Sequence, residues 1–422
     1  MSRILKEYRL FLTYPWNMRV LTVTNLIYGL VMPVIEIFIG AYVMRQSDDV
    51  RMVVTYQLAV YTGIPFTFFI NGWLLRYVSV KQLYSMGMLL SGISMTVMMS
   101  LNHLSLAGLG IAGLLMGMSF GLYWSNRDFL ALSSTNDSNR NYYYGLENFF
   151  ATNIGIIVPF LIGAFIGWYG QNSPVHVNQA YQIITGIVFV LTIIASIVVH
   201  QGDFSNPPRR TFLFFKFYWL WNRMLLLAVL KGLAQGYIVT APAMLVMKLV
   251  GKEGSLGMIT SIGGILSACL LYVIGRVAKP RHRIYLFSAG LSFFVLGALA
   301  NGILYNKVGV LIFMLLLVLG RPLADIAYFT IQMLVIDTVS AIENRNQYAY
   351  IFNQEFGFYI GRFLGCGLFL ILAFKISNEF ALRYALLIIG VLQLISIYVA
   401  KTILTGCTNL KNTNKYGGGG GN

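Results

Sequence analysis

The sequence predicts an all-α polytopic membrane protein with twelve transmembrane helices in two pseudo-symmetric six-helix bundles. The first observation is the composition, which is 57% hydrophobic and only 10% charged, whereas a soluble domain carries about 25% charged residues. The second is a series of apolar runs of about 20 residues, the length that a helix needs to cross a bilayer. The third is a polar-aromatic phrase that occurs twice. Helices satisfy their own backbone hydrogen bonds in lipid, and a β-barrel would instead show short alternating strands.

Twelve apolar runs are long enough to span the bilayer. Their approximate limits are 20–43, 52–75, 82–101, 105–133, 142–169, 178–199, 222–248, 255–278, 283–303, 308–338, 346–374 and 380–404. An even number of spans places both termini on the same side of the membrane. Lys and Arg are more frequent in the loops on that side, as at Arg209 and Arg210, than in the opposite loops. By the positive-inside rule we expect both termini to face the cytoplasm from the inner (plasma) membrane.

The repeated phrase indicates an internal duplication. NRNYYYGLENFF at 139–150 and NRNQYAYIFNQEF at 344–356 align at a shift of 205 residues. Trp16 matches Trp221 at the same shift, and Tyr123 matches Tyr328. A common offset at separated places predicts two parallel halves related by an axis along the membrane normal.

The predicted organisation has five segments. They are an N-terminal interfacial segment at 1–19, a first bundle at 20–200, a cytoplasmic linker at 201–221, a second bundle at 222–405 and a disordered tail at 406–422. The first segment mixes basic and aromatic residues, which is typical of a helix at the membrane surface. The linker is polar and contains two prolines, and the tail is rich in glycine.

Several classes of function are excluded by what the sequence lacks. The net charge of +16 would suggest a nucleic-acid partner in a soluble protein, but the basic residues lie mostly in short loops. The three cysteines and four histidines have no metal-ligand or disulfide spacing, so we expect no metal and no cofactor. We find no phosphate loop and no nucleophile–base pair, and we therefore expect no enzyme. No selectivity filter for a channel is present. The expected partners are a small-molecule substrate, protons or another coupling ion, and the lipid bilayer, with the chain as a monomer.

Two halves of six spans, cytoplasmic termini and a basic central loop resemble the major facilitator superfamily of secondary transporters over roughly residues 15–405. That family carries a loop of the form Gly-x-x-x-Asp-Arg-x-Gly-Arg-Arg between spans 2 and 3. Here GWLLRYVSVKQ keeps Gly72 and Lys81 at the two ends, whereas Arg76 replaces the acid and Ser79 the second glycine. The architecture therefore carries the resemblance more than this motif does. The resemblance implies that spans 1, 4, 7 and 10 line a central cavity.

The resemblance also places the repeated phrase at a cytoplasmic gate. Arg140 and Arg345 begin the two copies, and we expect them to form this gate together with Arg76. Asn148 and Asn353 lie one to two turns deeper and are candidates for a matched pair facing the cavity. An interhelical hydrogen bond is the alternative.

Span 5 carries Gly155, Pro159 and Gly163 at steps of four residues, which is similar to the motif of drug–proton antiporters in this family. Small residues at this spacing also let helices pack closely, and we favour this interpretation. Span 11 carries Gly357, Gly361 and Gly365 at the same spacing.

Charged residues at membrane depth define the expected site. Each costs about 2.5 to 3.5 kcal/mol on insertion scales. The predicted spans hold several, among them Glu36, Arg127, Asp128, Glu147, Lys231, Arg321, Asp325, Glu355 and Arg362. Most of them lie on or beside the four spans that the resemblance places around the cavity. The aromatic candidates for the cavity wall on the same spans are Tyr28, Tyr123, Trp124 and Tyr328.

Each charge has an alternative interpretation. Glu36 lies in apolar surroundings, PVIEIFIG, with no basic neighbour in the sequence, so we expect it to bind a proton or a substrate ammonium. The alternative is a structural ion pair with another helix. Asp128 is the second candidate for this role, and its own alternative is a partner on a neighbouring helix. Lys231 is expected to meet Glu36 or to bind an anionic group.

Three pairs of these charges lie close together in the sequence. Arg321 and Asp325 are four residues apart, so they can neutralise each other on one helix face. Glu355 and Arg362 also share a face, two turns apart. The side chains of the neighbours Arg127 and Asp128 diverge by about 100°.

The sequence therefore predicts a secondary active transporter that moves a small polar organic solute by alternating access, coupled to protons. The alternative is a proton-coupled efflux antiporter for lipophilic or multidrug substrates. The direction of transport stays open.

Overall fold

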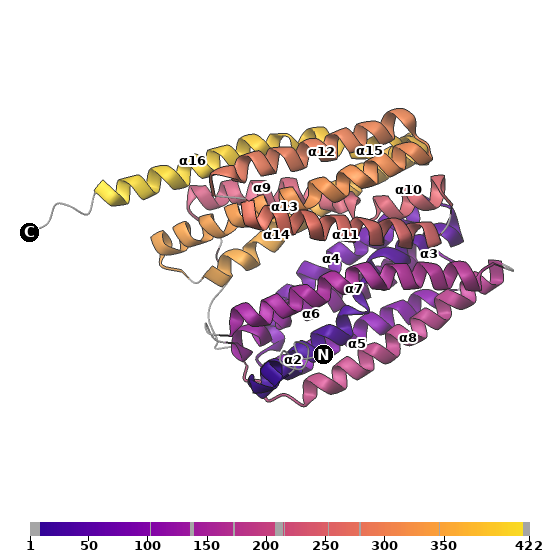
Figure 1. The fold of residues 1–422 in the computed structure, drawn as a ribbon, viewed down its shortest axis with the longest axis horizontal. Helices are drawn as coiled ribbons and strands as arrows, with labels where there is room; N and C mark the ends of the chain where they lie inside the picture. Colours follow the sequence, from indigo (N-terminus) through magenta and orange to yellow (C-terminus); the bar gives the residue numbers. More distant parts are fainter. Residues whose placement is uncertain are drawn as a thin grey trace, which may run out of the picture. The chain divides into compact units, whose positions relative to one another are not determined.

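A computed structural model of the chain describes residues 9–416 except 102, 136–138, 172–173, 207–213, 215, 252, 278–279 and 346. The described residues form helices joined by short turns and contain no β-strand. The prediction of an all-α protein is therefore confirmed (Figure 1).

Figure 1 labels the helices in chain order. The helices of the first half are α2 (Trp16–Gly29), the π-helix η1 (Val34–Phe38), α3 (Ile39–Ser47), α4 (Val50–Leu74), α5 (Val80–Met99), α6 (Leu106–Ser134), α7 (Arg140–Tyr169) and α8 (Pro174–His200). Those of the second half are α9 (Trp219–Ile238), α10 (Ala241–Leu249), α11 (Glu253–Val277), the 3-10 helix η2 (Pro280–His282), α12 (Arg283–Leu304), α13 (Lys307–Glu343), α14 (Gln347–Lys375), α15 (Asn378–Gln393) and α16 (Ile395–Tyr416).

Eleven of these helical segments, among the residues described, are long and apolar enough to cross a membrane. The sequence predicts twelve. The predicted span 82–101 corresponds to α5, a 20-residue helix that is not among the eleven. The sequence of α5 contains Lys81, Gln82 and three serines, all of which are buried. A helix whose polar side chains face protein crosses a bilayer at lower mean hydropathy than one that faces lipid all round.

The chain divides into two compact units. The first comprises residues 1–209 and 246–262, and the second comprises 210–245 and 263–422. The segment Val246–Ile262, which contains the end of α10 and the start of α11, therefore belongs to the first unit although it lies in the second half of the sequence. The bundle boundaries at 20–200 and 222–405 stay a prediction.

Within the first unit, α6 packs against both α4 and α5, and α5 also packs against α8. The approach of α4 to α6 depends on glycine. A Cβ atom on Gly117 would lie 2.1 Å from the carbonyl oxygen of Val60 and 2.9 Å from the Cα of Gly63. No larger side chain fits between these two backbones.

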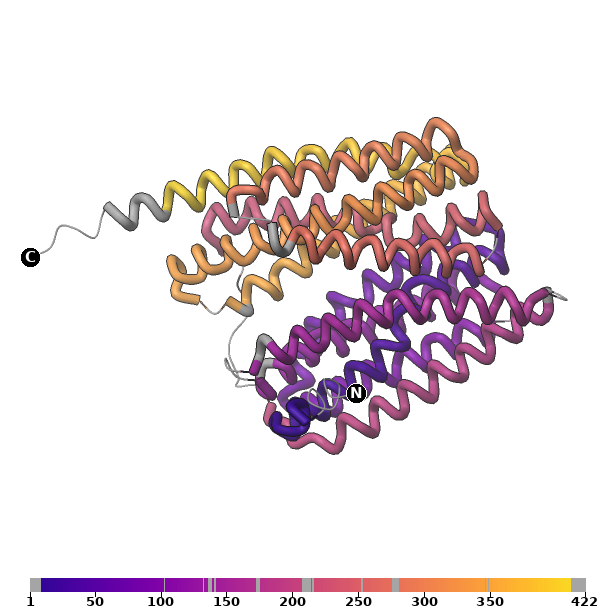
Figure 2. The backbone as a smooth tube through the Cα atoms, in the orientation of Figure 1, coloured from indigo at the N-terminus to yellow at the C-terminus, as the bar shows by residue number. Residues whose placement is uncertain are grey.

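Within the second unit, α9 packs against α14 and α12 packs against α13. Figure 2 shows the backbone trace of these helices. A hydrophobic core forms around Trp221, Tyr328 and Tyr350, all of which are fully buried. Gly357, Gly361 and Gly365 of α14 each face α9, and a Cβ on Gly361 would lie 2.0 Å from the carbonyl oxygen of Val229. The spacing of the glycines in span 11 therefore serves helix packing.

The last helix extends further than the sequence indicates. α16 continues to Tyr416, into the segment 406–422 for which the sequence predicts disorder. Cys407 is buried in the core cluster of the second unit, and a Cβ on Gly406 would lie 2.8 Å from the Trp219 ring. Contacts with the core thus stabilise this helical turn, although its polar and glycine-containing sequence does not favour a helix.

Candidate functional site

An ion pair between α6 and α7 is central to the first unit. The guanidinium of Arg127 contacts Glu147 Oε1 at 2.6 Å through Nη2, and its Nε donates to the same oxygen at 3.0 Å. Both side chains are largely buried, with 19% and 13% exposed. Arg127 Nη1 also lies 3.4 Å from the carboxylate of Asp128, which is 58% exposed. The two sequence neighbours thus differ in exposure, and Asp128 is the more accessible acid.

Asn25 of α2 connects this pair to a polar network. Its Nδ2 donates to Glu147 Oε1 at 2.7 Å and to the hydroxyl of Tyr143 at 2.9 Å, and its Oδ1 accepts from the hydroxyl of Tyr84. Asn25 and Tyr84 are absent from the residues that the sequence singles out. A polar amide within an apolar span is the signal that would have identified Asn25.

The aromatic candidates of the first unit differ in accessibility. Tyr123 packs between Tyr28 and Tyr84, with ring centroids 4.4 Å and 5.1 Å away, and Tyr28 and Tyr123 are buried. Trp124 is exposed and lies against the Arg127 guanidinium, 5.0 Å from the ring centroid. Of the candidates Tyr28, Tyr123 and Trp124, only Trp124 has an accessible ring in the first unit.

Glu36 lies at the centre of the π-helix η1, which begins directly after Pro33. Its side chain is exposed, whereas Val34, Ile35 and Phe38 in the same turn are buried. Single π-helical turns within longer helices are frequent at functional sites. The local geometry therefore places an accessible carboxylate in an otherwise apolar span.

In the second unit, the Lys231 ammonium of α9 donates to Asp325 Oδ1 of α13. Its Nζ also lies 4.3 Å from the centroid of the Tyr328 ring and 4.6 Å from that of Phe329. Arg321 Nε lies 3.7 Å from the second oxygen of Asp325. The pairing of Arg321 with Asp325 that their spacing indicates is therefore present, but the carboxylate is shared with Lys231.

Arg362 of α14 has a separate set of partners. Its Nη1 lies 3.7 Å from Glu355 of the same helix. Its Nε and Nη2 donate to Gln235 Oε1 of α9 at 3.2 Å and 3.0 Å. Gln354 connects the same helix to the buried Tyr328 hydroxyl with a hydrogen bond of 3.0 Å.

The two copies of the repeated phrase are used differently. Asn353 accepts a hydrogen bond of 2.8 Å from Trp221 Nε1, which fits the interhelical alternative, whereas Asn148 is exposed. Arg345 donates to the carbonyl oxygen of Lys216 at 2.7 Å and contacts Glu343 at 3.3 Å. Arg76 is exposed in the turn after α4. The side chain of Arg140 lies outside the residues described, so the proposed gate stays a prediction.

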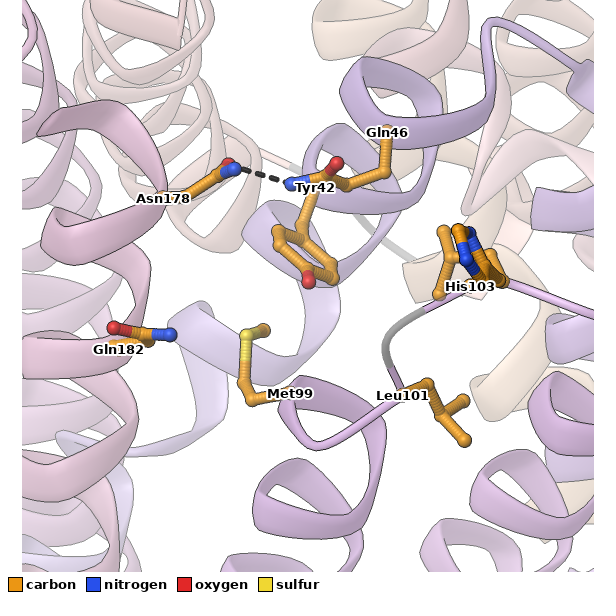
Figure 3. Close-up of a pocket in the computed structure, with 8 residues that line it drawn as sticks. Tyr42, Gln46, Met99, Leu101, His103, Asn178 and Gln182 are labelled. Carbon is orange, nitrogen blue, oxygen red and sulfur yellow. Dashed lines mark hydrogen bonds between the residues drawn. The ribbon is translucent and has the colours of Figure 1, made fainter. Parts of the chain in front are cut away.

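Each unit contains a cavity among the residues that the structure describes. The cavity of the second unit has a volume of about 80 Å³ and is lined by Lys231, Ala234, Gln235, Ile238, Val239, Phe287, Gly290, Leu291, Phe294, Leu317, Gly320, Arg321, Ala324, Asp325 and Gln393. The cavity of the first unit has a volume of about 380 Å³ and is lined by Tyr42, Gln46, Met99, Leu101, His103, Leu104, Asn178 and Gln182 (Figure 3). The described residues of its lining include no carboxylate, lysine or arginine, and two of them are joined by a hydrogen bond of 2.5 Å from Gln46 to Asn178.

Two further ion pairs connect α3 and its end to the segment Val246–Ile262 within the first unit. Arg45 forms a bidentate ion pair with Glu253. Its Nε donates to Oε1, and its Nη2 lies 2.6 Å from Oε2. The Glu253 side chain is buried. Lys248 contacts both oxygens of Asp48 at 2.9 Å and 3.0 Å. Close helix packing accompanies them, since a Cβ on Gly257 would lie 2.3 Å from the carbonyl oxygen of Pro159.

We expect Arg45→Met to lower the stability of the first unit by about 3 kcal/mol, because it leaves the buried Glu253 carboxylate without its guanidinium. Arg51→Met is the matched control, since Arg51 pairs with Asp49 at a more exposed position, where screening by solvent leaves the pair little effect on stability. Melting temperatures of the purified variants measure both effects. Equal melting temperatures for the two variants would contradict the expectation.

Comparisons with known proteins identify the family of this chain. A family model described as Major Facilitator Superfamily matches residues 20–366. An uncharacterized protein, YqgE of Bacillus subtilis (strain 168), is 21% identical over 384 residues, which cover 89% of this chain and 87% of that protein.

Two solved structures are similar over most of the chain. The nucleoside transporter NupG superposes with a TM-score of 0.67 at 12% identity and covers 92% of this chain and 99% of its own. PepTSo, a transporter of the POT family, superposes with a TM-score of 0.70 at 9% identity and covers 94% and 99%. At these identities the likeness shows the fold alone.

Proposed function

We propose that this chain moves a small polar organic solute across the membrane, coupled to protons. The chain belongs to the Major Facilitator Superfamily. It is a multi-pass membrane protein of the secondary transporter class. The observation that carries the proposal is the set of paired charged side chains that each unit holds within its candidate membrane-spanning helices. They are the Arg127–Glu147 pair in the first unit, and the Lys231–Asp325 and Arg362–Glu355 pairs in the second.

The cost of these charges supports a polar solute. Each charge at the centre of a bilayer costs several kcal/mol, and side chains of this kind mark substrate and ion pathways. Charges of both signs are suited to a solute with several polar groups, transported by alternating access.

The efflux of lipophilic compounds is the second candidate, and it rests on Gly155, Pro159 and Gly163 of α7. The contacts of Gly163 favour the packing interpretation instead. Its Cβ would lie 3.0 Å from the carbonyl oxygen of Glu253 and 3.1 Å from the Cα of Gly257. We therefore rank the polar solute first.

We propose Glu36 as the proton-binding group and both termini as cytoplasmic. The exposed position of Glu36 in a π-helical turn supports its role, since a carboxylate needs access to exchange a proton. The distribution of Lys and Arg among the loops supports the orientation in the inner membrane.

Glu36→Gln is expected to abolish uphill accumulation in proteoliposomes and to preserve counterflow exchange, because an amide binds solute without carrying a proton. The solute is chosen by a thermal-shift screen of polar compounds, since a ligand of the folded state raises its melting temperature. Glu379→Gln, at an exposed position in α15, is the matched control and is expected to retain both activities. Uphill accumulation that survives in Glu36→Gln would remove Glu36 from the coupling step, and an absence of counterflow in the unmodified protein would overturn transport itself.

A further inference from the structure

We propose that the cavity between α9, α12, α13 and α15 of the second unit binds a carboxylate of the transported solute, with Lys231 and Arg321 as its cations. Asp325 is the internal counter-ion that the carboxylate replaces. The inference rests on the proposed function and names the chemical class of its solute as an organic monocarboxylate.

The charge balance of the cavity carries the inference. Lys231, Arg321 and Asp325 all line it, so two cations share one carboxylate. Lys231 contacts one oxygen of Asp325, and Arg321 lies 3.7 Å from the other. One positive charge remains in excess, and a single carboxylate from the solute neutralises it.

The neighbouring charges do not remove this excess. Arg362 approaches from α14, where Glu355 neutralises it at 3.7 Å and Gln235 accepts two of its N–H groups. The Arg362–Glu355 pair is therefore balanced by itself. The excess stays with Lys231 and Arg321.

The accessibility of the three side chains suits an exchange of partners. The Lys231 side chain is only 13% exposed and its ammonium lies against the Tyr328 and Phe329 rings, which hold the cation in place. Arg321 is 60% exposed and Asp325 is 36% exposed. A fixed ammonium with an accessible guanidinium beside it can accept an external carboxylate while Asp325 turns away.

The walls of the cavity suit the rest of such a solute. Phe287, Leu291 and Phe294 of α12 line one side. Gln393 of α15 also lines the cavity, and its amide donates to the carbonyl oxygen of Leu230. Binding sites for small molecules are mostly apolar with a few placed polar groups. The volume of about 80 Å³ is larger than one water molecule needs, so the cavity has room for a carboxylate and its attached carbon.

The test compares acids with their neutral amides. Melting temperatures of the purified full chain are measured with lactate, benzoate and gluconate, and with lactamide, benzamide and gluconamide, at constant ionic strength. We expect at least one acid to raise the melting temperature and its amide to have no effect. Lys231→Gln is expected to weaken binding of that acid by about tenfold or more, because a charge-assisted contact is lost.

Two further variants make the test specific. Asp325→Asn removes the competing carboxylate and is expected to bind the acid more tightly than the unmodified protein. It also keeps the test decisive if Lys231→Gln does not fold. Lys307→Gln, at an exposed position at the start of α13, is the matched control and is expected to leave the affinity unchanged.

Three results would overturn the inference: no shift with any acid, equal shifts with acids and amides, or weaker binding in Asp325→Asn. A shift with a short-chain phosphatidylglycerol and with no acid would assign the site to a lipid headgroup and overturn it as well. Vesicle transport separates this failure from that of the proposed function. Transport of neutral solutes without acid binding refutes the carboxylate site alone, whereas acid binding without any transport refutes the proposed function alone.

Discussion

A Gly361→Val variant is expected to lose most of its folded second unit. The added Cβ would lie 2.0 Å from the carbonyl oxygen of Val229 and 2.7 Å from the amide nitrogen of Leu233. Both are backbone atoms of α9, which cannot rotate out of the way as a side chain can. Overpacking usually costs about 1 to 3 kcal/mol, and because here two helix backbones must separate, we expect a cost at or above the upper end of this range.

Gly367→Val provides the matched control on the same helix. No atom lies within 4 Å of the Cβ position of Gly367, so only a small loss of stability is expected there. Size-exclusion chromatography of the detergent extract, followed by a thermal melt, measures the folded yield and stability of both variants. If Gly361→Val were as stable as Gly367→Val, the close contact between α9 and α14 would be wrong.

Glu147→Gln is expected to destabilise the first unit by about 3 to 5 kcal/mol, the cost of removing one partner from a buried ion pair. Arg127 would lose the carboxylate whose Oε1 lies 2.6 Å from its Nη2 and 3.0 Å from its Nε. Asn25 would keep an amide oxygen as its acceptor, so the expected loss is that of the charge that balances Arg127. The melting temperature of the purified variant measures the loss.

Asp128→Asn is the control for this experiment, because it removes a carboxylate from the same arginine at an exposed position. Exposed pairs contribute about 0 to 1 kcal/mol, so a small effect is expected. Arg127→Met combined with Glu147→Leu should be more stable than Glu147→Gln alone, because no buried charge is left unpaired. A double variant as unstable as the sum of its two single variants would show that the pair is not coupled.

Most of the fold could be predicted from the sequence, because the length and apolar character of a membrane helix are local properties. The limits of the expected spans correspond closely to helices such as α8 and α12. The predicted span 82–101 also corresponds to a helix, α5, although its hydropathy keeps it out of the eleven candidate membrane spans. The extension of α16 to Tyr416 was missed, because the contacts of Cys407 with the core that stabilise it are tertiary.

The candidate site could be predicted only where the partners lie on one helix. The spacing of four residues between Arg321 and Asp325, and of seven between Glu355 and Arg362, predicts the contacts that the structure contains. Spacing does not predict the contact of Lys231 with Asp325 or that of Asn25 with Glu147, because these partners lie on different helices.

The sequence by itself determined the class of this protein, its helices and the charged residues within them. These follow from hydropathy and from a period of 3.6 residues, both of which act along one segment of chain. Only the tertiary structure decided which carboxylate each cation contacts. The rotation and height of one helix against the next are set by close packing at positions such as Gly117 and Gly361, and this packing depends on residues far apart in the sequence.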